Sequence, residues 1–157
     1  ARPKIADYPF TTLTPHLGVV KHKDSPAFVV ADIPGLIAGA SEGLGMGIQF
    51  LRHVERTRVL VHLIDISEET HTAAWKNFTA INRELKNYNP QLLDKEQLVC
   101  LNKIDLPAVR EKVKKTVAQF SKKGIILHPF SAATGEGLQD ILGKIVTLLD
   151  NTKNLEP

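Results

Sequence analysis

Cysteine, tryptophan and methionine are scarce in this sequence of 157 residues, which has one of each. A single cysteine excludes a disulfide bond within the chain. Cys100 lies in an apolar run, so we expect a buried and unreactive thiol. The sequence also lacks a signal peptide and any apolar run near the roughly 20 residues that a membrane-spanning helix needs. These absences predict a cytoplasmic domain that does not associate with a membrane.

Neither sign of charge is in large excess, because 20 basic residues stand against 17 acidic ones and the net charge is +3. This is too small to indicate nucleic-acid binding by itself, and we expect no DNA partner. The six histidines show no spacing typical of metal ligands, so we expect no transition-metal site. The length suits one domain. We assign residues 1–150 to this domain and residues 151–157 to a tail or linker.

Apolar patterns typical of strands and of helices alternate along the chain. Short apolar runs predict strands at 17–22, 27–31, 59–64 and 98–101 and within 125–130. Apolar residues three and four apart predict helices at 49–56, 74–88, 109–120 and 138–149. Gly35–Gly47 is too rich in glycine for a regular element. The alternation predicts an α/β fold, with a mostly parallel sheet and helices on both of its faces.

A polar segment follows the apolar run at 98–101, namely Asn102-Lys103-Ile104-Asp105. A carboxylate at the end of a strand can accept two hydrogen bonds from guanine, from N1–H and from the 2-amino group. Adenine has no such donor pair, so a carboxylate facing it would stay unpaired at a cost of about 1–3 kcal/mol. The segment is therefore typical of guanine recognition in GTP-binding proteins. By itself it is equally compatible with a surface turn after a strand.

A second polar segment, Asp32-Ile33-Pro34-Gly35, follows the apolar run at 28–31. An aspartate in this position is typical of the Walker B arrangement, where it holds the water shell of Mg²⁺. The glycine lets a backbone N–H approach the terminal phosphate closely. The alternative is a turn that only ends the strand.

A third segment, Ser131-Ala132-Ala133, follows the last apolar run and could offer a backbone N–H to guanine O6. Small residues are also common at strand ends, so this segment is informative mainly through its order after the other two. The carboxyl ends of parallel strands meet at one edge of a sheet. We therefore expect Asp32, Asn102 and Ser131 to lie in one cleft.

A fourth segment near the start of the chain has the features of a first switch loop. In that role a threonine hydroxyl ligates Mg²⁺ and the backbone contacts the γ-phosphate. The alternative is an ordinary loop bounded by proline. The segment comprises Phe10, Thr11, Thr12, Leu13 and Thr14.

Four stretches of the chain together resemble the Obg family of bacterial GTPases. They are Lys4–Leu13, Leu17–Val20, the glycine-rich Asp32–Gly45 and Phe50–Arg56. The resemblance runs from residue 1 to about residue 150 and implies a P-loop GTPase domain of the Ras-like type. It implies a GTP hydrolase that binds GTP and GDP with Mg²⁺. It also implies a role in assembly of the large ribosomal subunit, which would be a partner, and in the stress response. We expect a monomer.

The same resemblance implies roles for individual residues. Thr12 would ligate Mg²⁺ directly, and Asp32 would hold it through water. Phe10–Thr14 would surround the γ-phosphate, and Asp32–Gly35 would contact phosphate and the magnesium waters. Asn102, Lys103 and Asp105 would bind guanine. Ser131–Ala133 would close over the base.

Two features depart from the family pattern. The chain contains no G-x-x-x-x-G-K-S/T motif and does not begin with methionine. We therefore expect a piece of a longer protein, a GTPase domain incomplete at its N-terminus. The loss of a central strand would leave backbone edges unpaired and apolar side chains bare.

A further difference, from Ras-like enzymes, concerns the reaction. Leu36 directly follows Gly35, where Ras-like enzymes have a glutamine that orients the attacking water. We therefore predict slow hydrolysis, and no residue can be assigned as catalytic. The alternative function is a non-catalytic guanine-nucleotide sensor or ribosome-binding module, in which this chain cannot bind phosphate alone.

Overall fold

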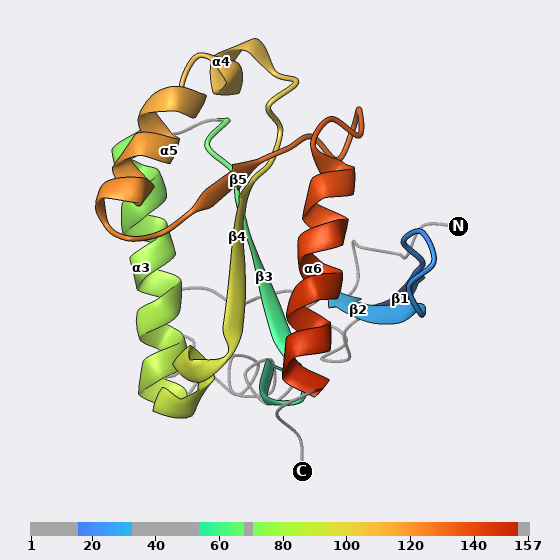
Figure 1. Cartoon of the computed structure of the whole chain (residues 1–157). Coiled ribbons are helices and arrows are strands. Elements are labelled where there is room, and N and C mark those ends of the chain that lie inside the picture. The colour runs from blue at the N-terminus through green and yellow to red at the C-terminus, as the bar shows by residue number, and fades with distance from the viewer. Residues whose placement is uncertain (1–15, 33–53, 68–70, 154–157) are drawn as a thin grey trace. The chain divides into compact units, whose positions relative to one another are not determined.

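Figure 1 shows a computed structural model of the chain, which describes residues 16–32, 54–67 and 71–153. The chain divides into two compact units. Unit 1 comprises Ala1–Thr57 and Ala80–Asp94, and unit 2 comprises Arg58–Thr79 and Lys95–Pro157. Among the described residues, no helix is both long and apolar enough to span a membrane.

Unit 1 contains a hairpin of two antiparallel strands, β1 (His16–Val20) and β2 (Phe28–Asp32). Both strands were predicted, and their ends differ from the prediction by one or two residues. The unit also contains the 3₁₀ helix η2 (Pro90–Asp94). Val54 and Glu55 are helical, but the remainder of the helix predicted at 49–56 lies outside the described residues, as does the glycine-rich stretch at 35–47.

Unit 2 contains a parallel sheet in the order β3-β4-β5. Its strands are β3 (Val59–Ile64), β4 (Glu96–Leu101) and β5 (Leu127–Pro129). The bounds of β3 match the prediction, β4 begins two residues earlier, and β5 lies within the predicted run. In register, Ile64 pairs with Leu101, and Leu101 with Pro129.

Helices cover both faces of this sheet, as predicted (Figure 1). On one face, strand residues such as Val99 and Leu101 share a buried core with Phe78 of α3 (His71–Tyr88) and Phe120 of α5 (Val113–Lys122). Trp75 lies at the margin of this core, with its ring centroid 5.0 Å from that of Phe120. On the other face, α6 (Leu138–Lys153) packs against β3. The α/β fold class is therefore confirmed.

Alternation along β4 divides its side chains between the two faces. Val99 and Leu101 belong to the core beneath α3 and α5, so Leu98 and Cys100 point to the opposite face. Cys100 has no exposed surface, and burial raises the pKa of its thiol to about 11. The prediction of a buried thiol is confirmed, and the raised pKa disfavours the nucleophilic thiolate near neutral pH.

The helix predicted at 109–120 is wrong in one respect, because the segment forms two helices. They are α4 (Pro107–Arg110) and α5, and residues 111–112 separate them. The Lys112 amide donates to the Val109 carbonyl at 2.9 Å, a tight three-residue turn that interrupts the α-helical ladder. Apolar spacing could not show this break, since Val109 and Val113 both contact the same core.

The C-terminal helix is longer than expected. We predicted a tail from residue 151, whereas α6 continues to Lys153. The apolar spacing that we used to predict this helix ends at Leu149, and the polar residues after it continue the helix without contributing to that pattern.

Candidate functional site

The described part of the candidate site lies at the carboxyl ends of β4 and β5. The Asn102 amide donates to the Ile64 carbonyl at the end of β3 (3.0 Å), and the Phe130 amide donates to the Leu101 carbonyl at the end of β4 (2.9 Å). The Ile104 amide in turn donates to the Phe130 carbonyl at 3.3 Å. Backbone hydrogen bonds therefore hold segment 102–105 and the loop after β5 together.

Segment 102–105 makes a tight turn as it leaves β4. Lys103 has a φ of 69°, a backbone conformation that residues other than glycine seldom adopt. The Asn102 side-chain oxygen accepts the Lys103 amide at 2.7 Å, and the Lys103 carbonyl accepts the Leu106 amide at 3.0 Å. These bonds oppose the local strain and fix the direction in which Asp105 leaves the turn.

The loop after β5 closes on itself. The Ser131 amide donates to the Glu136 carbonyl and the Gly135 amide to the Ser131 carbonyl, both at 2.8 Å. The Ser131 hydroxyl accepts the Thr134 amide at 3.1 Å. Ser131 is fully buried, whereas residues 132–136 are exposed. The loop therefore has a rigid base and an accessible outer part.

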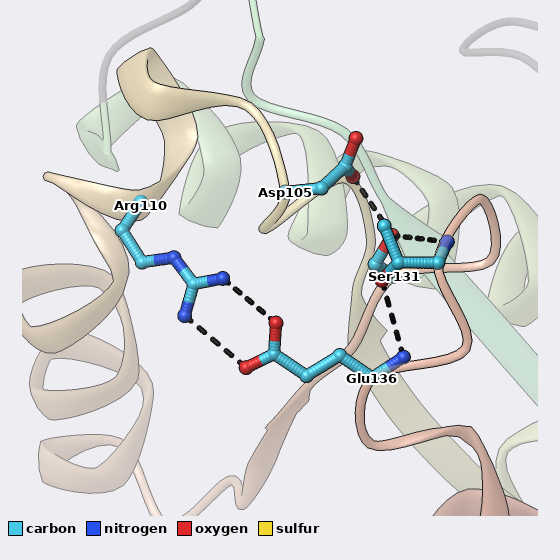
Figure 2. Close-up of polar contacts among 5 residues, drawn as sticks. Asp105, Arg110, Ser131 and Glu136 are labelled. Atoms are coloured by element: carbon cyan, nitrogen blue, oxygen red, sulfur yellow. Dashed lines mark hydrogen bonds and ion pairs between the residues drawn. The ribbon is translucent and has the colours of Figure 1, made fainter.

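Two side chains of segment 102–105 contact this loop directly. The Ser131 hydroxyl donates to Oδ1 of Asp105 at 2.8 Å (Figure 2), and the Ala132 amide donates to the Asn102 side-chain oxygen at 3.0 Å. Among the described residues, Oδ2 of Asp105 has no hydrogen-bond partner. Of the three residues expected to share a cleft, Asn102 and Ser131 therefore lie in adjoining segments, and Asp105 lies beside Ser131.

Lys103 contacts a carboxylate that we did not identify from the sequence. Its ammonium lies 2.7 Å from Oδ2 of Asp65, which follows β3, and both side chains are about half exposed. Burial raises the pKa of the Asp65 carboxyl, but Lys103 and the Ser67 backbone N–H outweigh this effect and hold the pKa below its ordinary value. The position of Asp65 after an apolar strand was the available signal, because it parallels that of Asp32.

An ion pair between Arg110 and Glu136 was also missed. Arg110 of α4 donates to both carboxylate oxygens of Glu136, at 2.7 and 3.2 Å (Figure 2). The two residues are 26 positions apart, and no sequence pattern links them.

The roles of the other predicted site residues stay predictions. Asp32 is the last residue of β2 and belongs to unit 1, whereas segment 102–105 and Ser131 belong to unit 2. Its role and its place in a common cleft stay predictions. So do the roles of residues that lie outside the described ranges, namely Phe10, Thr11, Thr12, Leu13, Thr14, Ile33, Pro34 and Gly35.

A family model described as "50S ribosome-binding GTPase" matches residues 1–103, more than half of the 157 residues. The chain belongs to this GTPase family. It is 60% identical to the GTPase Obg of Syntrophus aciditrophicus over 154 residues, covering 98% of the chain and 45% of that protein. It is 54% identical to the GTPase Obg of Moorella thermoacetica, covering 95% of the chain and 35% of that protein. The resemblance to Obg GTPases is confirmed, and the chain spans less than half the length of these relatives.

Solved GTPase structures share the fold. An Era structure in complex with MgGDPNP and part of 16S ribosomal RNA matches with a TM-score of 0.66 at 23% identity, covering 88% of this chain and 45% of that chain. A putative nucleolar GTP-binding protein 1 from Plasmodium falciparum matches with a TM-score of 0.60 at 23% identity, covering 88% and 71%. At this level of identity the matches support the P-loop GTPase fold of the Obg-type chain and nothing finer.

Proposed function

We propose that this Obg-type chain supplies the guanine-recognition part of a GTPase switch that binds GTP and GDP with Mg²⁺ and hydrolyses GTP slowly. Its partner would be the large ribosomal subunit, and its role would be in subunit assembly and the stress response. We further propose that it acts as a cytoplasmic monomer. The contact between Asp105 and the buried Ser131 carries the proposal, because it holds a carboxylate ready at the edge of a parallel sheet.

Guanine recognition would depend on side chains that are already oriented. Ser131 holds Oδ1 of Asp105, so the carboxylate loses little freedom when it accepts N1–H and the 2-amino group of the base. The Asn102 side-chain oxygen is occupied by two backbone amides, which leaves its NH₂ group to donate to a purine acceptor. Ala132, whose amide is one of these two donors, and Ala133 would close over the base together with Ser131.

The switch residues complete the proposal. Phe10–Thr14 would contact the γ-phosphate, Thr12 would ligate Mg²⁺ and Asp32 would hold it through water, with Ile33, Pro34 and Gly35 near phosphate. Mg²⁺ neutralises charge on the β- and γ-phosphates when it is bound. The family membership and the order of these segments support the assignment.

Replacement of Asp105 by asparagine tests the base assignment. The amide offers a donor where the carboxylate accepted, so guanine nucleotides should bind about 10- to 100-fold more weakly and xanthine nucleotides more tightly. Titration of fluorescent GDP and XDP analogues would measure this. Asp140→Asn, an exposed change in α6, is the matched control and should alter neither affinity. Unchanged GDP affinity in Asp105→Asn would remove Asp105 from the site.

The second candidate is a guanine-nucleotide sensor or ribosome-binding module that does not hydrolyse GTP. The observation that favours it is Leu36, which directly follows the segment Asp32–Gly35 and cannot hydrogen-bond to a water molecule. Both candidates require guanine binding, so the Asp105→Asn experiment does not separate them. Single-turnover hydrolysis does.

A further inference from the structure

We propose that Arg110 and Glu136 form a positioning pair that holds the loop Ser131–Gly137 against segment 102–105 and thereby slows the release of a bound guanine nucleotide. The proposal rests on the proposed function, since it assumes that this loop closes over the base. It adds two residues that lie outside the nucleotide-binding segments themselves.

Arg110 is tied to the same segment as Asp105. It is the last residue of α4, whose neighbouring residue Val109 is fully buried in the core. The amide of Arg110 donates to the Leu106 carbonyl at 2.9 Å, and the Leu106 amide donates to the Lys103 carbonyl at 3.0 Å. The guanidinium therefore extends from a support that is continuous with segment 102–105.

Glu136 lies in the exposed outer part of the loop. Its neighbours Gly135 and Gly137 have φ values of 86° and 76°, so the chain turns sharply on both sides of it. Its carbonyl accepts the Ser131 amide at the base of the loop, and its carboxylate accepts two bonds from Arg110. Two parallel bonds fix the relative orientation of the guanidinium and carboxylate planes, which a single bond does not.

The outer part of the loop has few other attachments. In the part of the chain that the structure describes, the loop contacts segment 102–110 through side-chain hydrogen bonds of Ser131 with Asp105, of the Ala132 amide with Asn102, and of Glu136 with Arg110. The first two lie at the base of the loop beside the candidate base site. The third holds the far end, so its loss should let residues 132–136 move.

The charges around Arg110 favour the closed arrangement. Hydrogen bonding to Arg110 lowers the pKa of the Glu136 carboxyl, while the nearby Asp105 carboxylate opposes this effect. Without Arg110, two carboxylates would repel each other across the loop. The Arg110 and Glu136 side chains are 53% and 50% exposed, so their pairing contributes little to global stability and is screened by salt.

The test uses the protein expressed from its complete reading frame, loaded with N-methylanthraniloyl GDP and chased with excess GDP. The variants are Arg110→Ala, Glu136→Ala, their combination, and the charge reversal Arg110→Glu with Glu136→Arg. Lys114→Ala, an exposed cation on α5, is the matched control. Each single variant should release nucleotide about 3- to 10-fold faster, and the combination no faster than the faster single variant. The reversal should restore most of the original rate.

Three further measurements make the outcome decisive. The thermal midpoints of all variants should match that of the unmodified protein, because a purely structural role would move them instead of the release rate. Raising the salt concentration should accelerate release from the unmodified protein but not from Arg110→Ala. Single variants that release nucleotide at the original rate, or effects that multiply in the combination, would overturn the proposed role of the pair.

The Asp105→Asn experiment separates this proposal from the proposed function. If Asp105→Asn exchanges guanine for xanthine preference while the Arg110 and Glu136 variants change nothing, only the role of the pair is wrong. If Asp105→Asn also has no effect, the proposed function is wrong as well.

Discussion

Gly137 shows how a single residue shapes the loop after β5. A Cβ atom placed there would lie 2.8 Å from the Pro129 carbonyl oxygen and 3.3 Å from the Phe130 Cα. Gly135 has a similar φ, but a Cβ atom there would meet nothing within 4 Å. Both positions favour glycine for their backbone conformation, and only Gly137 also requires it for space.

Substitution of these two glycines separates conformational strain from steric exclusion. Gly135→Ala should lower the free energy of unfolding by about 1 kcal/mol, the cost of a left-handed conformation in an L-residue. Gly137→Ala should lower it by roughly 2–4 kcal/mol, because the added methyl group meets backbone that cannot move aside. Urea denaturation followed by the fluorescence of Trp75 measures both values. Equal destabilisation by the two changes would contradict the steric account.

Residue patterns predicted part of the site and missed the rest. Asn102, Asp105 and Ser131 could be singled out because each follows an apolar strand and has the chemistry that guanine requires. Arg110 and Glu136 could not, because an exposed arginine and glutamate are ordinary surface residues until their positions in space are known. Asp65 is intermediate, since its position after β3 was visible but its pairing with Lys103 was not.

The packing of α3 against β3 and β4 partly buries a histidine. Nδ1 of His62 in β3 lies 3.0 Å from Oε1 of Gln97 in β4, and its ring centroid lies 5.0 Å from that of Phe78 in α3. Desolvation lowers the pKa of His62, and the Gln97 hydrogen bond only partly opposes this. Burial and Lys144 also lower the pKa of His128 in β5.

These two histidines predict a loss of stability in mild acid. The unfolded chain binds more protons than the folded one between the lowered pKa and the ordinary value of about 6.5. Stability is therefore full above about pH 6.5 and decreases as the pH falls through the folded-state pKa values. Urea midpoints measured at several pH values should show this decrease, and His62→Gln should flatten it. A pH dependence in His62→Gln as steep as in the unmodified protein would assign the effect to other groups.

The positions of the strands were predicted better than the break between neighbouring helices. Each strand of the sheet is a short apolar run that stands out against polar flanks, so β3, β4 and β5 were found close to their observed bounds. The break between α4 and α5 was not found, because the apolar residues on both sides of it face one core. Backbone hydrogen bonding at Lys112 decides it.

At the scale of the whole molecule, two apolar side chains of β3 are poorly covered. Val61 and Leu63 share a face with Leu98 and Cys100 and are 40% and 57% exposed. In the described part of the chain, β3 pairs with β4 alone. Parallel sheets usually have both faces covered, so these two side chains are an exception within the described sheet.

The predicted slow hydrolysis of GTP is a property to be measured on the whole protein. With Leu36 unable to orient water, single-turnover hydrolysis by the protein from its complete reading frame should be on the order of 10⁻³ s⁻¹ or slower. Large ribosomal subunits should accelerate it, and Leu36→Gln should do so without them. Leu93→Gln, a change at an exposed leucine, is the control and should have no effect.

The outcomes of this measurement are distinct. A fast basal rate that Leu36→Gln leaves unchanged would contradict the assignment of Leu36. Binding without hydrolysis, even with subunits present, would favour the non-catalytic sensor.

The sequence alone predicted the fold class and the resemblance to Obg GTPases, and it singled out segment 102–105 as a candidate for guanine recognition. Strand patterns and strand-end motifs are local, so they can be identified from the sequence without the tertiary structure. Only the tertiary structure decided which of these segments touch. The contact of Ser131 with Asp105 and the pairing of Arg110 with Glu136 each join residues 26 positions apart. Such contacts depend on the register of β4 with β5, which brings two strand ends to one edge of the sheet. No local pattern specifies that register.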